Sequence, residues 1–380
     1  MSEAFKLLFL GAGFSQPAGL PLGVELFQAV RRSIIVEHGR DNHVEWDLER
    51  YIRYLNDCEG CCQTADTIDY EQFLGFLDVE HYLGLKGKDT WSEEGNESQL
   101  MVRRAIAQVL FKRTPEQPPT LYREFVRRLK CSDIILTFNY DTLLESALEA
   151  EGVPYRLFLD RFSEIGWRSN TVDNSKDEVV VLKLHGSIDW FDRAVYDRHV
   201  AMAQECPNPY QVKHPVFGKD RIVGSTPLTD GPRAKNDPLA QLYRVRDLRP
   251  LLARGFWECC PLILAPSQNK LFYAQSLREF WRGLQRAGGF NLSLGVVGYS
   301  LPPYDAYARQ VIYHVFSNYT DYEPDLEFNG RKKGRIRILD YRLDGDSGDE
   351  IRTRYRYADW RRTDLRLDGF CENTLEWLLA

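Results

Sequence analysis

The sequence predicts an α/β fold built on a doubly wound, mostly parallel, Rossmann-like sheet with a helical insertion. Two observations predict it: short apolar runs alternate with helix-like segments, and glycine or polar motifs follow several of these runs directly. Such runs are typical of strands that are buried on both faces of a parallel sheet. The predicted strands are Lys6–Leu10, Ile134–Phe138, Val179–Leu184, Leu262–Ala265, Leu292–Val297 and Arg335–Leu339.

A helical insertion separates the first predicted strand from the second. Between about residues 39 and 130, apolar residues recur at helical spacing in Val44–Leu55, Ile68–Leu83, Gln99–Lys112 and Leu121–Lys130. The charged stretch Lys86–Glu97 predicts an exposed loop. We therefore expect a Rossmann-like domain over residues 1–38 and 131–380, with a helical insertion over residues 39–130.

The second half of the chain predicts further helices and one irregular region. Asp141 is suited to cap a helix over Thr142–Ala150, and Asp305–Phe316 places its apolar residues on one helical face. Phe191–Leu248 predicts an irregular lid or partner surface. Near the C-terminus, arginines that alternate with Thr and Tyr predict a strand with one cationic face, either solvated or docking an acidic partner; they are Arg352, Arg354 and Arg356.

Composition and charge exclude several classes of protein. Of the 380 residues, 43% are hydrophobic and 27% are charged, as in ordinary soluble proteins. The net charge of −6 argues against a general nucleic-acid-binding surface. No apolar run is long enough to span a bilayer and Met1–Ala4 does not resemble a signal peptide, so we expect a cytoplasmic protein. The eight cysteines form only one CxxC pair, Cys58 with Cys61, so we expect no structural zinc.

The residues that carry chemistry follow predicted strands, whose carboxyl ends share one edge of a parallel sheet. Gly11–Ser15 forms a glycine turn whose backbone N–H groups suit a pyrophosphate, although Gln16 in place of a third glycine argues against a hydride-transfer enzyme. Asn139 and Asp141 follow the second strand, and His185 follows the third, where an imidazole suits a general base. A tight turn, a helix cap and a core histidine are the plainer interpretations. Together, the motifs predict an enzyme that binds NAD and breaks it.

This set of motifs resembles the sirtuin superfamily. The motifs are Gly11–Ser15 with Gly19-Leu20-Pro21, then Thr137–Asp141, then Leu184–Ser187. Leu294–Pro302 is similar to the late strand–loop motif of the bacterial branch of the family, the sirtuin-like NAD hydrolases of antiphage defence. The resemblance covers almost the whole chain.

The chain departs from the protein-deacylating sirtuins at positions that handle acyl peptides. Phe138-Asn139-Tyr140-Asp141 stands where they have Gln-Asn-Ile-Asp, and Leu22-Gly23-Val24 follows the first motif where they have an arginine. Their four-cysteine zinc module and their Phe-Gly-Glu motif have no counterpart. The resemblance therefore implies an NAD glycohydrolase, which uses water to release nicotinamide and ADP-ribose from NAD and needs no metal.

The resemblance also implies roles for individual residues. Asn139 would orient the ribose or the attacking water, and His185 would take a proton from water or a ribose hydroxyl. Asp141 would stabilise the cation or hold the nicotinamide amide. The glycine turn would cradle the pyrophosphate, and a second loop would border the adenosine. The expected NAD-binding residues are Gly11, Ala12, Gly13, Phe14, Ser15, Gly19, Pro21, Gly298, Tyr299 and Ser300.

Unrestrained hydrolysis of NAD would harm the host, so we expect a triggered effector of antiphage defence that acts by NAD depletion. The resemblance implies a homo-oligomer and a separately encoded sensor or ATPase, of HerA type or Argonaute-like. The apolar pattern and the acidic net charge predict no membrane and no direct nucleic-acid contact. Three alternatives stay open: an NAD-dependent protein deacylase, a non-catalytic subunit that binds NAD or ADP-ribose, and a structural subunit of a nucleic-acid-processing complex.

Overall fold

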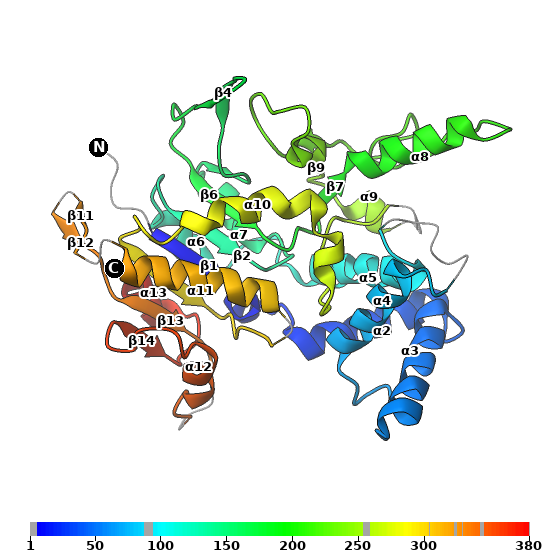
Figure 1. Cartoon of the computed structure of the whole chain (residues 1–380), viewed down its shortest axis with the longest axis horizontal. Helices are drawn as coiled ribbons and strands as arrows, with labels where there is room; N and C mark the ends of the chain where they lie inside the picture. Colours follow the sequence, from blue (N-terminus) through cyan, green and yellow to red (C-terminus); the bar gives the residue numbers. More distant parts are fainter. Residues whose placement is uncertain are drawn as a thin grey trace.

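A seven-stranded parallel sheet forms the centre of the molecule (Figure 1). The computed structural model describes residues 6–86, 94–253, 259–303, 305–322, 325–328, 330–342 and 346–379. The strand order is β14-β13-β10-β1-β2-β6-β3, and every neighbouring pair runs parallel. The predicted fold class is therefore confirmed. The strands are β1 (Lys6–Leu10), β2 (Ile134–Thr137), β3 (Tyr155–Arg156), β6 (Val179–Lys183), β10 (Ser293–Val297), β13 (Ile336–Leu339) and β14 (Thr363–Arg366).

Five of the six predicted strands lie in this sheet, and the sixth does not. Leu262–Ala265 runs beside the loop after β6, where the N–H of Leu264 donates to the carbonyl of His185 at 2.8 Å. Gly186 permits this approach because its φ is +81° and an added Cβ would lie 2.1 Å from the Leu262 carbonyl oxygen. The prediction of a sheet strand there is wrong because the backbone hydrogen bonds of the segment go to the loop after β6 and to Trp190, and not to a strand of the central sheet.

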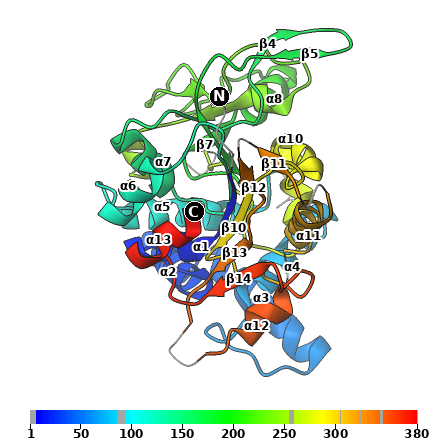
Figure 2. The ribbon, with the colours of Figure 1, turned by 90° about the vertical axis from the view of Figure 1, so that its left-hand side faces the viewer.

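Helices cover both faces of the sheet, which explains why β1 and β10 are buried along their whole length. Figure 2 shows the sheet nearly edge-on, with α7 and α13 on one side and α10 and α11 on the other. The helices outside the insertion are α1 (Ala12–Ser15), α2 (Gly23–His38), α7 (Leu143–Ala150), α8 (Arg193–Glu205), α9 (Arg249–Leu252), α10 (Arg278–Arg282), α11 (Ala306–Asp321), α12 (Asp349–Arg354) and α13 (Glu372–Leu379).

The insertion contains the four predicted helices: α3 (His43–Tyr54), α4 (Tyr70–Tyr82), α5 (Glu97–Arg113) and α6 (Thr120–Arg127). Here α5 packs against α2, and α6 packs against α7. The buried carboxylate of Asp78 on α4 joins the insertion to the loop after Leu264, because it accepts hydrogen bonds from Gln99 Nε2 at 2.6 Å and from Ser267 Oγ. The division into two domains stays a prediction. Most of the predicted loop Lys86–Glu97 lies outside the described residues.

Two further regions differ from their sequence interpretation. Phe191–Leu248 was expected to be irregular but contains α8 and the antiparallel strands β7 (Trp190–Asp192), β9 (Leu242–Arg244) and β8 (Thr226–Pro227). The predicted cationic strand with Arg352, Arg354 and Arg356 is wrong, since α12 ends at Arg354. Acidic residues in the first turn and arginines in the last turn stabilise a helix through its dipole, which outweighs a three-residue alternation. The remaining strands form two hairpins, β4 (Phe162–Ile165) with β5 (Asn170–Val172) and β11 (Glu327–Phe328) with β12 (Arg331–Lys332).

The described ranges contain neither a candidate membrane span nor a candidate metal cluster. None of the helices there has the length and apolar character needed to cross a membrane. Nor do the described His, Cys, Asp and Glu side chains gather in threes in a way that would hold a metal ion.

Candidate functional site

The candidate site lies where the direction of chain winding changes, between β1 and β10. From β1 the chain proceeds to β2 and β6 on one side, and β10, β13 and β14 lie on the other side. In doubly wound sheets the loops that leave two such strands diverge and form the ligand crevice. The two loops here begin at Gly11 and Gly298, so the sequence motifs at both positions lie at this crevice.

The two loops touch each other directly. The N–H of Gly11 donates to the carbonyl of Val297 at 2.9 Å, and the N–H of Gly13 donates to the carbonyl of Gly298 at 2.9 Å. Gly298 has a φ of +59°, and a Cβ added there would lie 2.4 Å from Gly13 Cα. Only glycine fits a contact that close. The Gly13 N–H, which would face a pyrophosphate, is therefore already bonded within the protein.

The amide of Asn139 joins the second strand to the glycine turn. Its Nδ2 donates to the carbonyl of Gly11 at 2.9 Å and to Ser15 Oγ at 3.0 Å, and its backbone N–H donates to Thr137 Oγ1 at 3.1 Å. Because parallel strands β1 and β2 are direct neighbours, residues that follow them meet at one sheet edge. The structure thus brings Asn139, Gly11 and Ser15 together.

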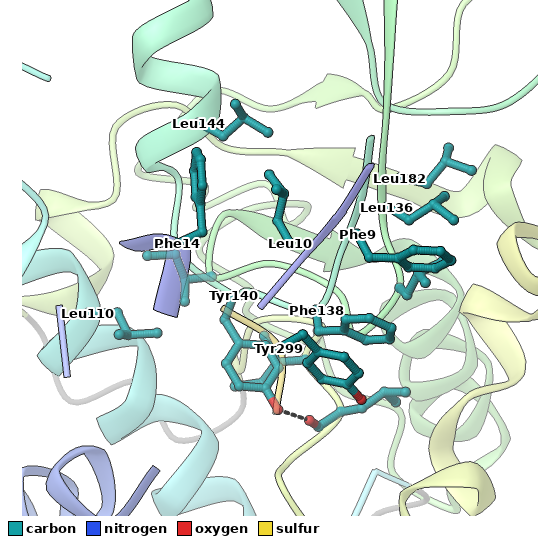
Figure 3. Close-up of a cluster of buried hydrophobic side chains, with 14 of the residues drawn as sticks. Phe9, Leu10, Phe14, Leu110, Leu136, Phe138, Tyr140, Leu144, Leu182 and Tyr299 are labelled. Atoms are coloured by element: carbon teal, nitrogen blue, oxygen red, sulfur yellow. Dashed lines mark hydrogen bonds between the residues drawn. The ribbon is translucent and has the colours of Figure 1, made fainter. Parts of the chain in front are cut away.

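A cluster of aromatic side chains packs between Asn139 and His185. Figure 3 shows Phe138 stacked on Tyr299, and the centroids of these two rings are 4.1 Å apart. Phe138 and His185 pack edge to face, with ring centroids 5.1 Å apart. Trp281 lies against His185 at 6.4 Å and donates its indole N–H to the carbonyl of Leu184 at 3.2 Å. Tyr140 donates to the Leu264 carbonyl at 2.5 Å. These rings fix the orientation of the imidazole.

His185 is buried and neutral in this arrangement. Its residue surface is only 4% exposed, and burial, with a smaller effect from the Lys270 ammonium, lowers its pKa to about 3. Its Nε2 lies 2.5 Å from the hydroxyl of Tyr307 on α11. Burial raises the pKa of Tyr307, so this phenol keeps its proton, and it donates to Nε2 in the tautomer whose ring proton is on Nδ1. In that tautomer, Tyr307 occupies the lone pair that a general base needs.

Charged groups surround this histidine. Lys270 and Asp305 form a buried ion pair, and Asp305 also accepts a hydrogen bond from Tyr299 at 2.8 Å. Burial raises the pKa of Glu71 on α4, although the ammonium of Lys270 opposes that shift. Lys270 and Asp305 act on His185 in opposite directions, the cation lowering its pKa and the carboxylate raising it. The helical insertion thus supplies a carboxylate to the surroundings of the site.

Asp141 lies in a different setting from His185. Its Oδ1 accepts the N–H of Leu143 at 3.0 Å at the start of α7, and its carbonyl accepts a hydrogen bond from the buried ammonium of Lys183. The sequence predicted Asp141 as the N-cap, but α7 begins one residue later, so Thr142 is the N-cap and Asp141 binds the first N–H of the helix from the position before it. Its action on a substrate stays a prediction.

The other expected NAD-binding residues differ in how they meet the crevice. Ala12 is exposed beside the two loops, whereas the Phe14 ring packs in the core against Phe370, with centroids 4.6 Å apart. Gly19 is exposed beyond the turn and Pro21 is buried. The carbonyl of Ser300 accepts a hydrogen bond from Arg354 at 2.7 Å. Any contact of these residues with NAD stays a prediction.

Sequence reasoning missed three side chains near the histidine, Tyr307, Lys270 and Trp281, and it missed Glu71, which acts electrostatically on Tyr307 and Lys270. Asp305 had been noted only as the start of a helical segment. A helix that begins directly after a strand and Pro302-Pro303 is the one signal that would have drawn attention to Tyr307.

Comparison with known proteins gives one family match. Residues 133–203 match the model of the SIR2-like domain. The match begins just before β2 and includes Asn139, Asp141 and His185, so three of the residues discussed above lie inside this SIR2-like segment. No match was found among curated proteins.

Several solved sirtuin structures align with most of the chain at low identity. One of them, described as showing the structural basis for sirtuin substrate affinity, is 12% identical; the alignment covers 99% of this chain and 92% of that one, with a TM-score of 0.33. Sir2 bound to an acetylated peptide is 13% identical, with 98% and 90% coverage and a TM-score of 0.33. Sir2 with a p53 peptide and NAD+ is 12% identical, with 99% and 92% coverage and a TM-score of 0.32. Family likeness therefore rests on the SIR2-like segment.

Proposed function

We propose that the protein is an NAD glycohydrolase that converts NAD and water into nicotinamide and ADP-ribose. One observation carries the proposal: an amide and an imidazole flank a glycine turn at the crevice between β1 and β10. Asn139 bonds to Gly11 and Ser15, and Phe138 links this amide to the ring of His185. The SIR2-like segment, which contains Asn139 and His185, supports NAD as the substrate.

The reaction breaks the bond between nicotinamide and C1′ of the ribose, and the oxygen of water bonds to C1′. His185 Nε2 takes the proton that this water loses, which requires a neutral ring and a rise of its pKa from about 3 when substrate and the developing charges enter the site. Asn139 holds the water or the ribose hydroxyls in place. The glycine turn receives the pyrophosphate on backbone N–H groups. A carboxylate at Asp141 or Glu71 would stabilise the positive charge that develops on the sugar.

The contacts in the crevice support a resting state that needs a trigger. Gly13 N–H is bonded to Gly298, and Nε2 of His185 is bonded to Tyr307. Substrate therefore replaces two internal hydrogen bonds before it meets the reacting groups. Because NAD loss harms a cell, such restraint suits an effector of antiphage defence, and we propose a homo-oligomer that a separately encoded sensor or ATPase activates.

A direct assay tests the proposal. Purified protein is incubated with NAD, alone and with the product of its neighbouring gene, and nicotinamide and ADP-ribose are measured over time. Asn139→Ala and His185→Ala should each lower the rate by about 10²–10⁴-fold while the proteins remain folded, as expected when a proton-transfer or positioning group is lost. Nicotinamide release at the wild-type rate by either variant would remove that residue from the mechanism.

Two further conditions of the same assay distinguish the hydrolase from the alternative functions. Consumption of NAD only when an acetylated peptide is added would identify a protein deacylase instead. Tight NAD binding without turnover under every condition, with and without the partner, would identify a binding subunit. Release of nicotinamide with water alone as acceptor would support the hydrolase.

A further inference from the structure

A groove opens at the amino end of the sheet, away from the candidate site. Its volume is about 640 Å³. Its lining includes Lys6 and Ser293, the first residues of β1 and β10, whereas Gly11 and Gly298 follow the last residues of the same strands. The groove and the crevice thus lie at opposite ends of the two central strands. Figure 1 shows the neighbouring hairpin β11–β12 at the end of the molecule opposite α3 and α4.

The lining of the groove is strongly cationic although the whole chain carries a net charge of −6. One carboxylate, Glu376, lines it as well, and buried Asp133 lies 3.8 Å from the Lys6 ammonium. The cations therefore outnumber these two carboxylates, and the groove has a positive field. The basic residues of the lining are Lys6, Arg128, Lys130, Arg331, Lys332 and Arg337.

The floor of the groove holds a buried donor with no partner. Ser293 is 8% exposed, and its Oγ has no hydrogen-bond partner within the part of the chain that the structure describes. Buried hydroxyls are normally hydrogen-bonded, so an unsatisfied one in a hollow indicates a group that enters from outside. Arg337 on β13 is half-buried in the same lining, and its burial lowers its pKa, so an added anion would restore its solvation.

We propose that this groove is a second ligand site, which binds a phosphorylated small molecule of nucleotide size. Guanidinium groups bind phosphate oxygens through paired, charge-assisted hydrogen bonds. The volume falls within the range of about 300–1,000 Å³ typical of small-molecule sites. The Ser293 hydroxyl lies at the floor of a hollow, where a compact phosphate reaches it more readily than the backbone of a nucleic acid. This site does not depend on the proposed NAD hydrolysis.

Calorimetric titration of the full-length protein with inorganic tripolyphosphate and with ATP tests the site. We expect one saturable event. Arg331→Gln/Lys332→Gln changes two exposed cations of the groove and should weaken binding by roughly a hundredfold, because each of the two charge-assisted contacts contributes about a factor of ten. Ser293→Ala should weaken it by roughly fivefold. The matched control, Arg32→Gln/Arg53→Gln, changes exposed arginines on α2 and α3 and should bind as wild type does.

Further outcomes decide between this site and others. Binding that is lost in Asn139→Ala but kept in the groove variant would place the anion at the crevice and overturn the proposal, as would the absence of saturable binding. A labelled 20-nucleotide single strand that binds through the groove cations and resists displacement by tripolyphosphate would also overturn it. Equal binding by Asn139→Ala and wild type, with loss in the groove variant, supports it.

Discussion

Replacing Gly298 with alanine tests the contact that closes the crevice. The new Cβ would lie 2.4 Å from Gly13 Cα and 2.5 Å from the backbone nitrogen of Phe14, and the backbone φ of +59° disfavours any side chain. The left-handed conformation costs about 1–2 kcal/mol for a non-glycine residue. Forcing a methyl group into a packed site costs about 1–3 kcal/mol more. We expect the free energy of unfolding to fall by about 2–5 kcal/mol.

Gly152→Ala is the matched control. Its φ is +64°, but no atom lies within 4 Å of an added Cβ, so it carries the conformational cost without the clash. Both substitutions reduce the entropy of the unfolded chain alike. Urea unfolding followed by tryptophan fluorescence should therefore show Gly298→Ala less stable than Gly152→Ala by about 1–3 kcal/mol. Equal losses in the two variants would refute the close contact between the two loops.

Three other predictions concern buried polar groups. Tyr307→Phe removes the hydrogen bond to His185 Nε2, which is worth about 1 kcal/mol, and should raise nicotinamide release without a trigger roughly fivefold. Tyr313→Phe on the same helix should leave the rate unchanged, and an unchanged or lower rate in Tyr307→Phe contradicts the prediction. Burial lowers the pKa of folded His185 to about 3 from the ordinary value of about 6.5, so the free energy of unfolding falls as pH drops below 6.5, by about 2 kcal/mol at pH 5. Urea midpoints should depend less on pH in His185→Asn, and identical profiles would contradict the shift. Lys183→Met leaves the buried Glu145 carboxylate unpaired and should lower the free energy of unfolding by about 3–5 kcal/mol, much of which Glu145→Leu should restore in the double variant. Chemical denaturation measures both variants, and a wild-type free energy of unfolding in Lys183→Met would contradict the prediction.

The central strands were predictable because each one is a short run of apolar residues, as expected of a strand buried on both faces. β1 matches its prediction at both ends, since Lys6–Leu10 is an apolar run that turns into glycine. The short edge strands β3 and β14 were missed because their residues are half-exposed or carry charge and resemble loops. Local pattern therefore identifies the middle of the sheet better than its rims.

The candidate site was predictable only where its residues follow strands. Asn139 and the glycine turn meet because β1 and β2 are neighbours, which the topology of a parallel sheet makes predictable. Lys270 lies on a short 3₁₀ helix, Lys270–Tyr273, and Glu71 lies on an insertion helix. No periodic feature of the sequence connects those segments with His185, because only tertiary packing brings them near it.

Glu71 connects the helical insertion electrostatically with the candidate site. Its carboxylate acts electrostatically on Tyr140 and Tyr307, which belong to the sheet side of the site. A displacement of α4 would therefore alter the electrostatic surroundings of Tyr307, whose hydroxyl meets His185 Nε2, while the strands stay where they are. A molecule bound to the outside of α4 would then act on the Tyr307 phenol, and through that hydrogen bond on His185, without entering the crevice.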